Sequence, residues 1–328
     1  MDTQLIREID KNSVLRNLST QDGHTLPVLP SLDYIHAATS DNTRKAYQAD
    51  IRHFMKSGGK LPAGVDDILC YLQHYATTLN PRTLERRLTA LKNWHCYQGF
   101  PDPTAHPLIR KTLTGIKHVH GKPKDKALPI TLETLATMIG YLKASPRLID
   151  CRNAALLQIG FFGAFRRSEL VSLTWENTRF VAEGLEILIP RSKTDQSGEG
   201  SICAIPYGHQ ALCPVTALLE WRKRGQKNTG YVFCSLKNNT PCLTAIPENQ
   251  VNLIIKSIAT ACQLLNAESY SSHSLRRGFA TEASRKGAPF GTIMRQGRWK
   301  HEGTVLGYID EGKRFDQNAA GIVLKSNE

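Results

Sequence analysis

Hydrophobic residues recur at helical spacing along the first third of the chain, in segments that proline and glycine separate. After Ser40, which can cap a helix, Tyr47, Ile51 and Phe54 fall on one face until a glycine pair ends the segment. Three more amphipathic segments follow: VDDILCYLQHYATTL, PRTLERRLTALKNWHCYQG with a proline in its first turn, and HPLIRKTLTGIKH. The pattern predicts a helical domain over residues 35–118.

The rest of the chain mixes long apolar segments with short ones. Thr131 can cap a helix over ITLETLATMIGYL, and the apolar helix in CRNAALLQIGFFGAFRRSEL breaks at Gly163 and restarts at SEL. Two strand candidates, LEILIP and SICAIPY, flank a turn that contains glycine, and YVFCS is also strand-like. Further helical segments are ALCPVTALLEWRKRG and NQVNLIIKSIATACQLL. We expect a domain over residues 130–328 that is mainly α with a small β-sheet.

Two segments lack these patterns. Residues 1–34 are polar, and we interpret them as a leader rather than a domain. Residues 119–129 contain GKPKDKALP, in which glycine, two prolines and alternating lysines disfavour a helix. We interpret this segment as an extended basic linker between the two domains.

The charge balance indicates a polyanionic partner. The chain has 42 Lys and Arg against 29 Asp and Glu, a net charge of +13, although a basic enzyme with a merely solvated surface is an alternative. Basic residues concentrate in the linker and on the helical segments before it, opposite their apolar faces. The candidate DNA-binding residues are Arg44, Lys45, Arg82, Arg86, Arg87, Lys122, Lys124 and Lys126.

Other function classes are disfavoured. The eight cysteines form no CxxC pair, so we expect free thiols and no metal site. The N-terminal residues have no apolar core of a signal peptide, and no apolar run approaches the ~18 residues that span a bilayer. We therefore expect no membrane partner and a cytoplasmic location.

Residues 270–310 hold the candidate chemistry. His273 and Arg276 form an HxxR pair at the start of a helical run, and Trp299 precedes Tyr308 by nine residues. Together they supply donors for a phosphate and one hydroxyl nucleophile, which suits attack on a phosphodiester. Tyr270 is an alternative nucleophile.

Three segments resemble the motifs of the tyrosine recombinases, the phage integrase family. GAFRRSEL resembles the first arginine motif, SHSLRRGFAT the HxLR motif, and GRWKHEGTVLGYI the nucleophile motif, and they occur in the order found in that family. The N-terminal helical pattern is similar to the core-binding domain of the family, so the resemblance covers most of the chain. The family often has histidine nine residues before its tyrosine, whereas Trp299 stands there, as in the Cre-like branch.

The resemblance implies a role for each motif residue. Spacing favours Arg166 over Arg167 and Arg276 over Arg277, and His301 stands at the wrong distance for the histidine role. Glu169 is the expected partner that orients an arginine. The implied catalytic residues are Arg166 and Arg276 on the phosphate, Lys193 as general acid, His273 for protons or phosphate binding, Trp299, and Tyr308 as nucleophile.

The family further implies a site-specific DNA recombinase that needs no cofactor or metal and forms a 3′-phosphotyrosyl intermediate. The enzyme, of bacterial or phage origin, would associate with the nucleoid and would integrate, excise or resolve the DNA of a mobile element. We expect a homotetramer on paired sites and a monomer or weak dimer without DNA, with the apolar tail DQNAAGIVL docked into a neighbouring protomer. A type IB topoisomerase and a catalytically inactive DNA-binding accessory protein are alternatives.

Overall fold

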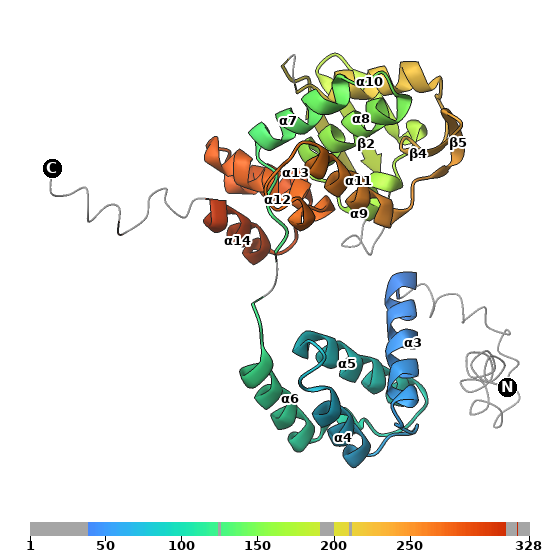
Figure 1. The fold of residues 1–328 in the computed structure, drawn as a ribbon, viewed down its shortest axis with the longest axis vertical. Helices are drawn as coiled ribbons and strands as arrows, with labels where there is room; N and C mark the ends of the chain where they lie inside the picture. Colours follow the sequence, from blue (N-terminus) through green and yellow to red (C-terminus); the bar gives the residue numbers. More distant parts are fainter. Residues whose placement is uncertain (1–38, 124–125, 191–199, 210–211, 313–319, 321–328) are drawn as a thin grey trace, which may run out of the picture. The chain divides into compact units, whose positions relative to one another are not determined.

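The computed structural model describes residues 39–123, 126–190, 200–209, 212–312 and 320 (Figure 1). The chain divides into two compact units, residues 1–124 and 125–328, and this boundary falls inside the segment predicted to be a linker. The predicted leader, Lys124, Lys193 and all of the apolar tail except residue 320 lie outside the described residues.

The first unit is helical, and the helices match the four amphipathic segments. They are α3 (Asp41–Lys56), α4 (Val65–Tyr75), α5 (Pro81–Tyr97) and α6 (Pro107–His120), with a short 3-10 turn, η1 (Pro103–Ala105), before the last. The Ser40 hydroxyl accepts a hydrogen bond from the Thr43 amide at 3.3 Å, which confirms the predicted cap. Helix α6 continues two residues into the predicted linker.

The apolar faces of these helices form one core. Phe54, Ile68, Leu72, Leu84 and Ile109 are fully buried and belong to a single hydrophobic cluster of the unit. They come from α3, α4, α5 and α6, so every helix contributes to the same interior. Arg82, Arg86 and Lys92 of α5 are exposed, as the sequence pattern predicts.

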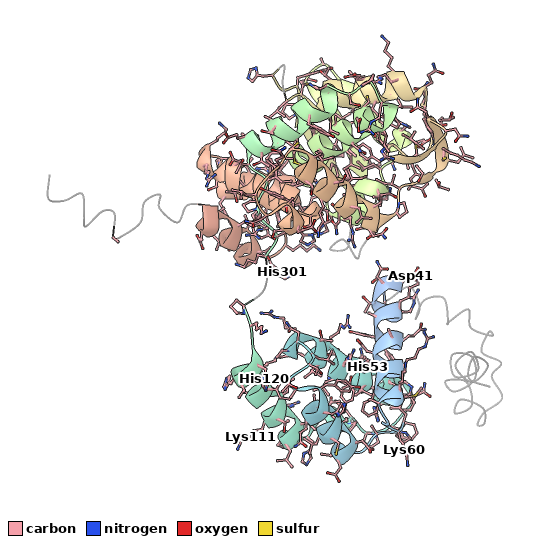
Figure 2. All side chains as sticks on the ribbon, viewed as in Figure 1. Asp41, His53, Lys60, Lys111, His120 and His301 are labelled. Carbon is pink, nitrogen blue, oxygen red and sulfur yellow. The ribbon has the colours of Figure 1, made fainter. Side chains whose placement is uncertain are left out.

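Arg87 is an exception and corrects one prediction. Its guanidinium Nη1 donates to the Tyr71 hydroxyl at 2.6 Å and to His53 Nδ1 at 2.8 Å, and its Nε lies 3.4 Å from Asp50 Oδ1. His53, which Figure 2 labels, lies on α3. Because Arg87 is only 9% exposed, it stabilises the helical unit and is not displayed for DNA.

The second unit is built round α8 (Leu148–Phe162), which is buried along almost its whole length. Helices α7 (Leu132–Lys143), α10 (Pro214–Gly225) and α12 (Ser272–Arg285) pack against it (Figure 1). The predicted break at Gly163 is confirmed, and the chain restarts as α9 (Arg167–Val171). The remaining elements are η2 (Trp175–Asn177), α11 (Glu248–Ala261), η3 (Ala267–Ser269), α13 (Phe290–Gly297) and α14 (Glu302–Gly312).

Two small antiparallel sheets complete this unit. The first has the order β1-β2-β3, with β1 (Thr178–Val181), β2 (Gly184–Ile189) and β3 (Ser201–Pro206). Strands β2 and β3 are the two predicted strands, in register from Gly184 opposite Pro206 to Ile189 opposite Ser201. The second sheet pairs β4 (Cys234–Lys237) with β5 (Thr240–Ala245), so the YVFCS prediction is confirmed only for its last two residues.

Within the described residues, no helix has the length and apolar character needed to cross a membrane. In the same residues, no group of three or more His, Cys, Asp or Glu side chains is arranged to hold a metal ion. All eight cysteines are free thiols.

Candidate active site

Helix α12 begins with a cap that fixes the HxxR pair. The Ser271 amide donates to Ser274 Oγ at 2.9 Å, and the Ser274 amide in turn donates to the Ser271 carbonyl at 2.9 Å. His273 therefore lies in the first turn with an exposed side chain, and Arg276 lies one turn later on the buried side, 6% exposed. One helix thus presents both residues of the motif at the edge of the core.

The break between α8 and α9 positions Arg166 and Glu169. Ala164 adopts a left-handed backbone with φ 45°, which redirects the chain so that Arg166 becomes the N-cap residue of α9. The Arg166 amide donates to Glu169 Oε2 at 2.9 Å, and its guanidinium Nη1 lies 2.6 Å from Glu169 Oε1. The predicted pairing of Glu169 with an arginine is therefore present in the structure.

A second arginine, Arg298, binds the same carboxylate. Its Nη2 lies 3.2 Å from Glu169 Oε2 and also donates to the Gly163 carbonyl at 3.1 Å. Burial alone would raise the pKa of Glu169, but the charges of Arg298 and Arg166 and the Arg166 amide hold it below its ordinary value. Glu169 is therefore an anion that binds both Arg166 and Arg298, which lie far apart in the sequence.

Arg276 is buried beside these residues. Its guanidinium donates to the Ala164 carbonyl and, at 2.7 Å, to the Gly297 carbonyl. Burial and the neighbouring cation Arg166 lower the pKa of Arg276 to about 9, so the guanidinium remains charged at neutral pH. Among the described side chains, three arginines surround one carboxylate, so this cluster has an excess of positive charge.

The two aromatic residues complete the arrangement. The Arg276 guanidinium lies 4.4 Å from the centre of the Trp299 ring, and the Trp299 and Tyr308 rings meet edge to face with centroids 6.3 Å apart. Helix α14 carries Tyr308, and the Thr281 hydroxyl of α12 donates to the Tyr308 carbonyl at 3.1 Å. The structure thus joins the three sequence motifs through direct contacts.

Comparison with known proteins agrees with this geometry. Residues 130–314 match the model of the phage integrase family, which is more than half of the chain. The chain belongs to the phage integrase family. It is a tyrosine-type site-specific DNA recombinase, an enzyme that cuts and rejoins DNA.

Relatives of this recombinase match over nearly its full length. An integrase/recombinase xerD homolog of Selenomonas ruminantium is 33% identical over 335 residues, covering 97% of this chain and 96% of the relative. Recombinase cre of Escherichia phage P1 is 26% identical, with 96% and 92% covered.

Solved structures share the fold of the recombinase. The XerH site-specific recombinase bound to palindromic difH substrate aligns with a TM-score of 0.61 at 20% identity, covering 86% of this chain and 79% of that one. A lambda integrase dimer bound to a COC′ core site aligns with a TM-score of 0.62 at 15% identity, covering 88% and 78%.

The recombinase structure gives the competing arginines different partners. Arg277 donates to the Ala127 carbonyl, and Arg167 pairs with Glu248 at 3.3 Å. Tyr270 is buried, 8% exposed, whereas His301 is exposed on the surface (Figure 2). Sequence reasoning missed Arg298, because adjacency to Trp299 was its only signal.

The remaining candidate DNA-binding residues lie on the surface of their own units. Arg86 is half exposed and pairs with Asp50 at 2.8 Å, and Arg44 pairs with Asp41 in the same helix. Neither pair removes the side chain from the surface. Lys45, Arg82, Lys122 and Lys126 are also exposed.

Proposed function

We propose that this recombinase cleaves duplex DNA by attack of the Tyr308 hydroxyl on the scissile phosphate. A bond forms between the tyrosine oxygen and phosphorus, the bond from phosphorus to the 5′ oxygen breaks, and a 3′-phosphotyrosyl intermediate results. The tyrosine proton leaves, and the departing 5′ oxygen gains one. The convergence of Tyr308 and Trp299 with Arg276 carries this proposal.

The arginines would stabilise the phosphate as its charge grows. Arg166 and Arg276 can donate charge-assisted hydrogen bonds to the non-bridging oxygens. Glu169 would hold the Arg166 guanidinium in place, and Arg298 binds the same carboxylate. A phosphate would also supply the negative charge that the cluster of arginines lacks. In this mechanism two guanidiniums provide the charge stabilisation, so a bound metal or cofactor is not required.

The other motif residues would transfer protons or bind the phosphate. We assign Lys193 as the general acid for the 5′ oxygen and His273 as a phosphate-binding or proton-handling group. Trp299 can donate its indole N–H to a phosphate oxygen but cannot carry a proton, so it differs from a histidine at that position.

The partner would be duplex DNA with a specific recombination site, held by both units. The proposed backbone contacts from the first unit and the linker exclude the buried Arg87. The proposed contacts with the DNA backbone are Arg44, Lys45, Arg82, Arg86, Lys122, Lys124 and Lys126. These roles fit a cytoplasmic enzyme that integrates, excises or resolves the DNA of a mobile element.

An apolar cavity supports a homotetramer on paired sites. The cavity of about 300 Å³ lies between β3, α12 and α13, and it is lined mainly by apolar side chains, among them Phe162, Ile205, Leu212, Phe279 and Ile293. The apolar segment DQNAAGIVL of a neighbouring protomer is the occupant we propose, because its aliphatic residues match this lining. Each protomer would then carry one donor segment and one acceptor, which permits a closed ring.

The decisive experiment traps the intermediate and follows its products. Duplexes that the Tyr308→Phe variant selects from a random library are rebuilt with a nick near the crossover, so that cleavage releases a short strand and leaves the protein attached. We expect covalent protein on the nicked duplex and joined products from two distinguishable intact sites, in a tetramer by sedimentation. Relaxation of supercoils without joining would instead favour a type IB topoisomerase, and binding without adduct would favour an accessory protein.

Binding should also weaken steeply with salt. Each phosphate neutralised contributes about 0.9 to the slope of log affinity against log salt concentration, so changing Lys122, Lys124 and Lys126 together to alanine should flatten it. Filter binding on the selected duplex measures the slope. The double variant Lys56→Ala/Lys60→Ala, outside the proposed contacts, should keep the wild-type slope. An unchanged slope in the triple variant would show that the linker does not contact DNA.

A further inference from the structure

Two consecutive arginines of α12 each lie against one aromatic residue of the site. The Arg276 guanidinium lies 4.4 Å from the centre of the Trp299 ring, and that of Arg277 lies 5.3 Å from the centre of the Tyr308 ring. The two rings touch edge to face. The four side chains therefore contact one another in the order Arg276, Trp299, Tyr308 and Arg277, so that Tyr308 lies between Trp299 and Arg277.

The far end of Arg277 is anchored to the segment that joins the two units. Its Nη1 donates to the Ala127 carbonyl. Three residues later the Ile130 amide donates to the Ser274 carbonyl at 3.1 Å, which fastens this segment to α12. Gly278 lets the segment come this close, since a Cβ there would lie 1.9 Å from the Ile130 carbonyl oxygen.

Burial makes the orientation of Arg277 specific. The side chain is 6% exposed, and a buried cation is stable only where acceptors or an aromatic face compensate it. The Ala127 carbonyl and the Tyr308 ring both do so. One turn further along α12, Thr281 donates to the Tyr308 carbonyl at 3.1 Å, so the helix holds both the ring and the backbone of the same residue.

We propose that Arg277 is a positioning residue for the nucleophile. It fixes the plane of the Tyr308 ring against α12 and so holds the hydroxyl at the distance and angle that attack requires. The inference rests on the proposed role of Tyr308, and it gives Arg277 a task separate from that of Arg276, which faces the phosphate-binding side. Because Arg277 is bound to the Ala127 carbonyl, the orientation of the Tyr308 ring would also depend on the position of residues 127–130 against α12.

Such a role predicts a selective defect. The loss of the contact between this buried cation and the ring should slow cleavage by Tyr308 about tenfold, which corresponds to ~1.4 kcal/mol in the barrier. Activation of the phosphate itself should not change, because Arg166 and Arg276 keep their partners. A reaction that uses the phosphate site without Tyr308 therefore separates positioning from a general structural effect.

The experiment uses the full-length protein and the selected nicked duplex in two assays. The first measures single-turnover formation of the covalent adduct. The second uses the Tyr308→Phe background with hydrogen peroxide as an external nucleophile and measures strand cleavage. Arg277→Met should lose about tenfold in the first assay and nothing in the second, with unchanged DNA binding. Arg285→Met, a control in the same helix whose guanidinium pairs with Glu282 at the surface, should match wild type in both.

The other outcomes overturn the inference. Equal losses of Arg277→Met in the two assays would mean that it acts on the phosphate or on the fold, and no loss would mean that the ring needs no support. If Arg277→Met does not fold, Arg277→Lys tests the inference instead. Lysine keeps a buried cation but lacks the planar guanidinium that contacts the Ala127 carbonyl and the Tyr308 ring at once. This variant should show a smaller loss confined to the first assay. An adduct in Tyr308→Phe would overturn the proposed nucleophile as well, which distinguishes the two failures.

Discussion

Replacing Tyr308 with phenylalanine is expected to abolish covalent attachment to DNA while binding is retained. The change removes one oxygen atom, the only one able to form the phosphotyrosyl bond. The contacts that place the residue do not use this oxygen, since Trp299 and Arg277 touch the ring and Thr281 binds the backbone carbonyl. Denaturing electrophoresis of the nicked duplex measures the adduct, and mobility shift measures binding.

Tyr270 supplies the matched control for this prediction. It is a buried tyrosine at the entry to α12, 8% exposed, and no role in catalysis is proposed for it. Tyr270→Phe should form adduct at the wild-type rate. Adduct that persists in Tyr308→Phe but disappears in Tyr270→Phe would reverse the two assignments.

Helix positions were predictable where local signals agree. Ser40 and Thr131 accept the hydrogen bonds expected of N-caps, and the glycine after α8 ends that helix as predicted. The short strands β1 and β5 were missed, because four to six residues, none of them fully buried, carry little hydrophobic periodicity. Their pairing depends on partner strands and not on their own sequence.

Site residues were predictable when a motif fixes their spacing, and much less so when only tertiary contacts do. Arg166, Glu169 and Arg276 meet as the motifs imply. Arg298 could not be foreseen, because its role depends on a left-handed backbone, φ 54°, that turns it toward a carboxylate 129 residues away in sequence. Arg87 was mistaken for the same reason, since its partners Asp50 and Tyr71 lie on other helices.

The same contacts explain how the site tolerates so much positive charge. Glu169 offsets only part of the charge of Arg166 and Arg298, and Arg276 relies on two backbone carbonyls. The lowered pKa of Arg276 shows that its charged form is held at a cost. A phosphate entering beside these groups would relieve that cost, and more so as its charge grows in the transition state.

Lys193 remains a proposal from the sequence, and its loss should have the second large effect. If it protonates the leaving 5′ oxygen, Lys193→Ala should slow cleavage by about 10²–10⁴-fold, the range for a lost general acid. Single-turnover cleavage of the nicked duplex measures this. A slower rate alone does not identify the role, because lost phosphate binding has the same effect.

A substrate with sulfur in place of the bridging 5′ oxygen resolves the ambiguity. A thiolate leaves without a proton, so this substrate should restore cleavage by Lys193→Ala to nearly the wild-type rate. Arg166→Ala should remain slow on it, because charge still develops on the non-bridging oxygens that Arg166 is proposed to bind. If sulfur does not rescue Lys193→Ala, another residue donates the proton. His273, exposed in the first turn of α12, would then be the first residue to test in the same way.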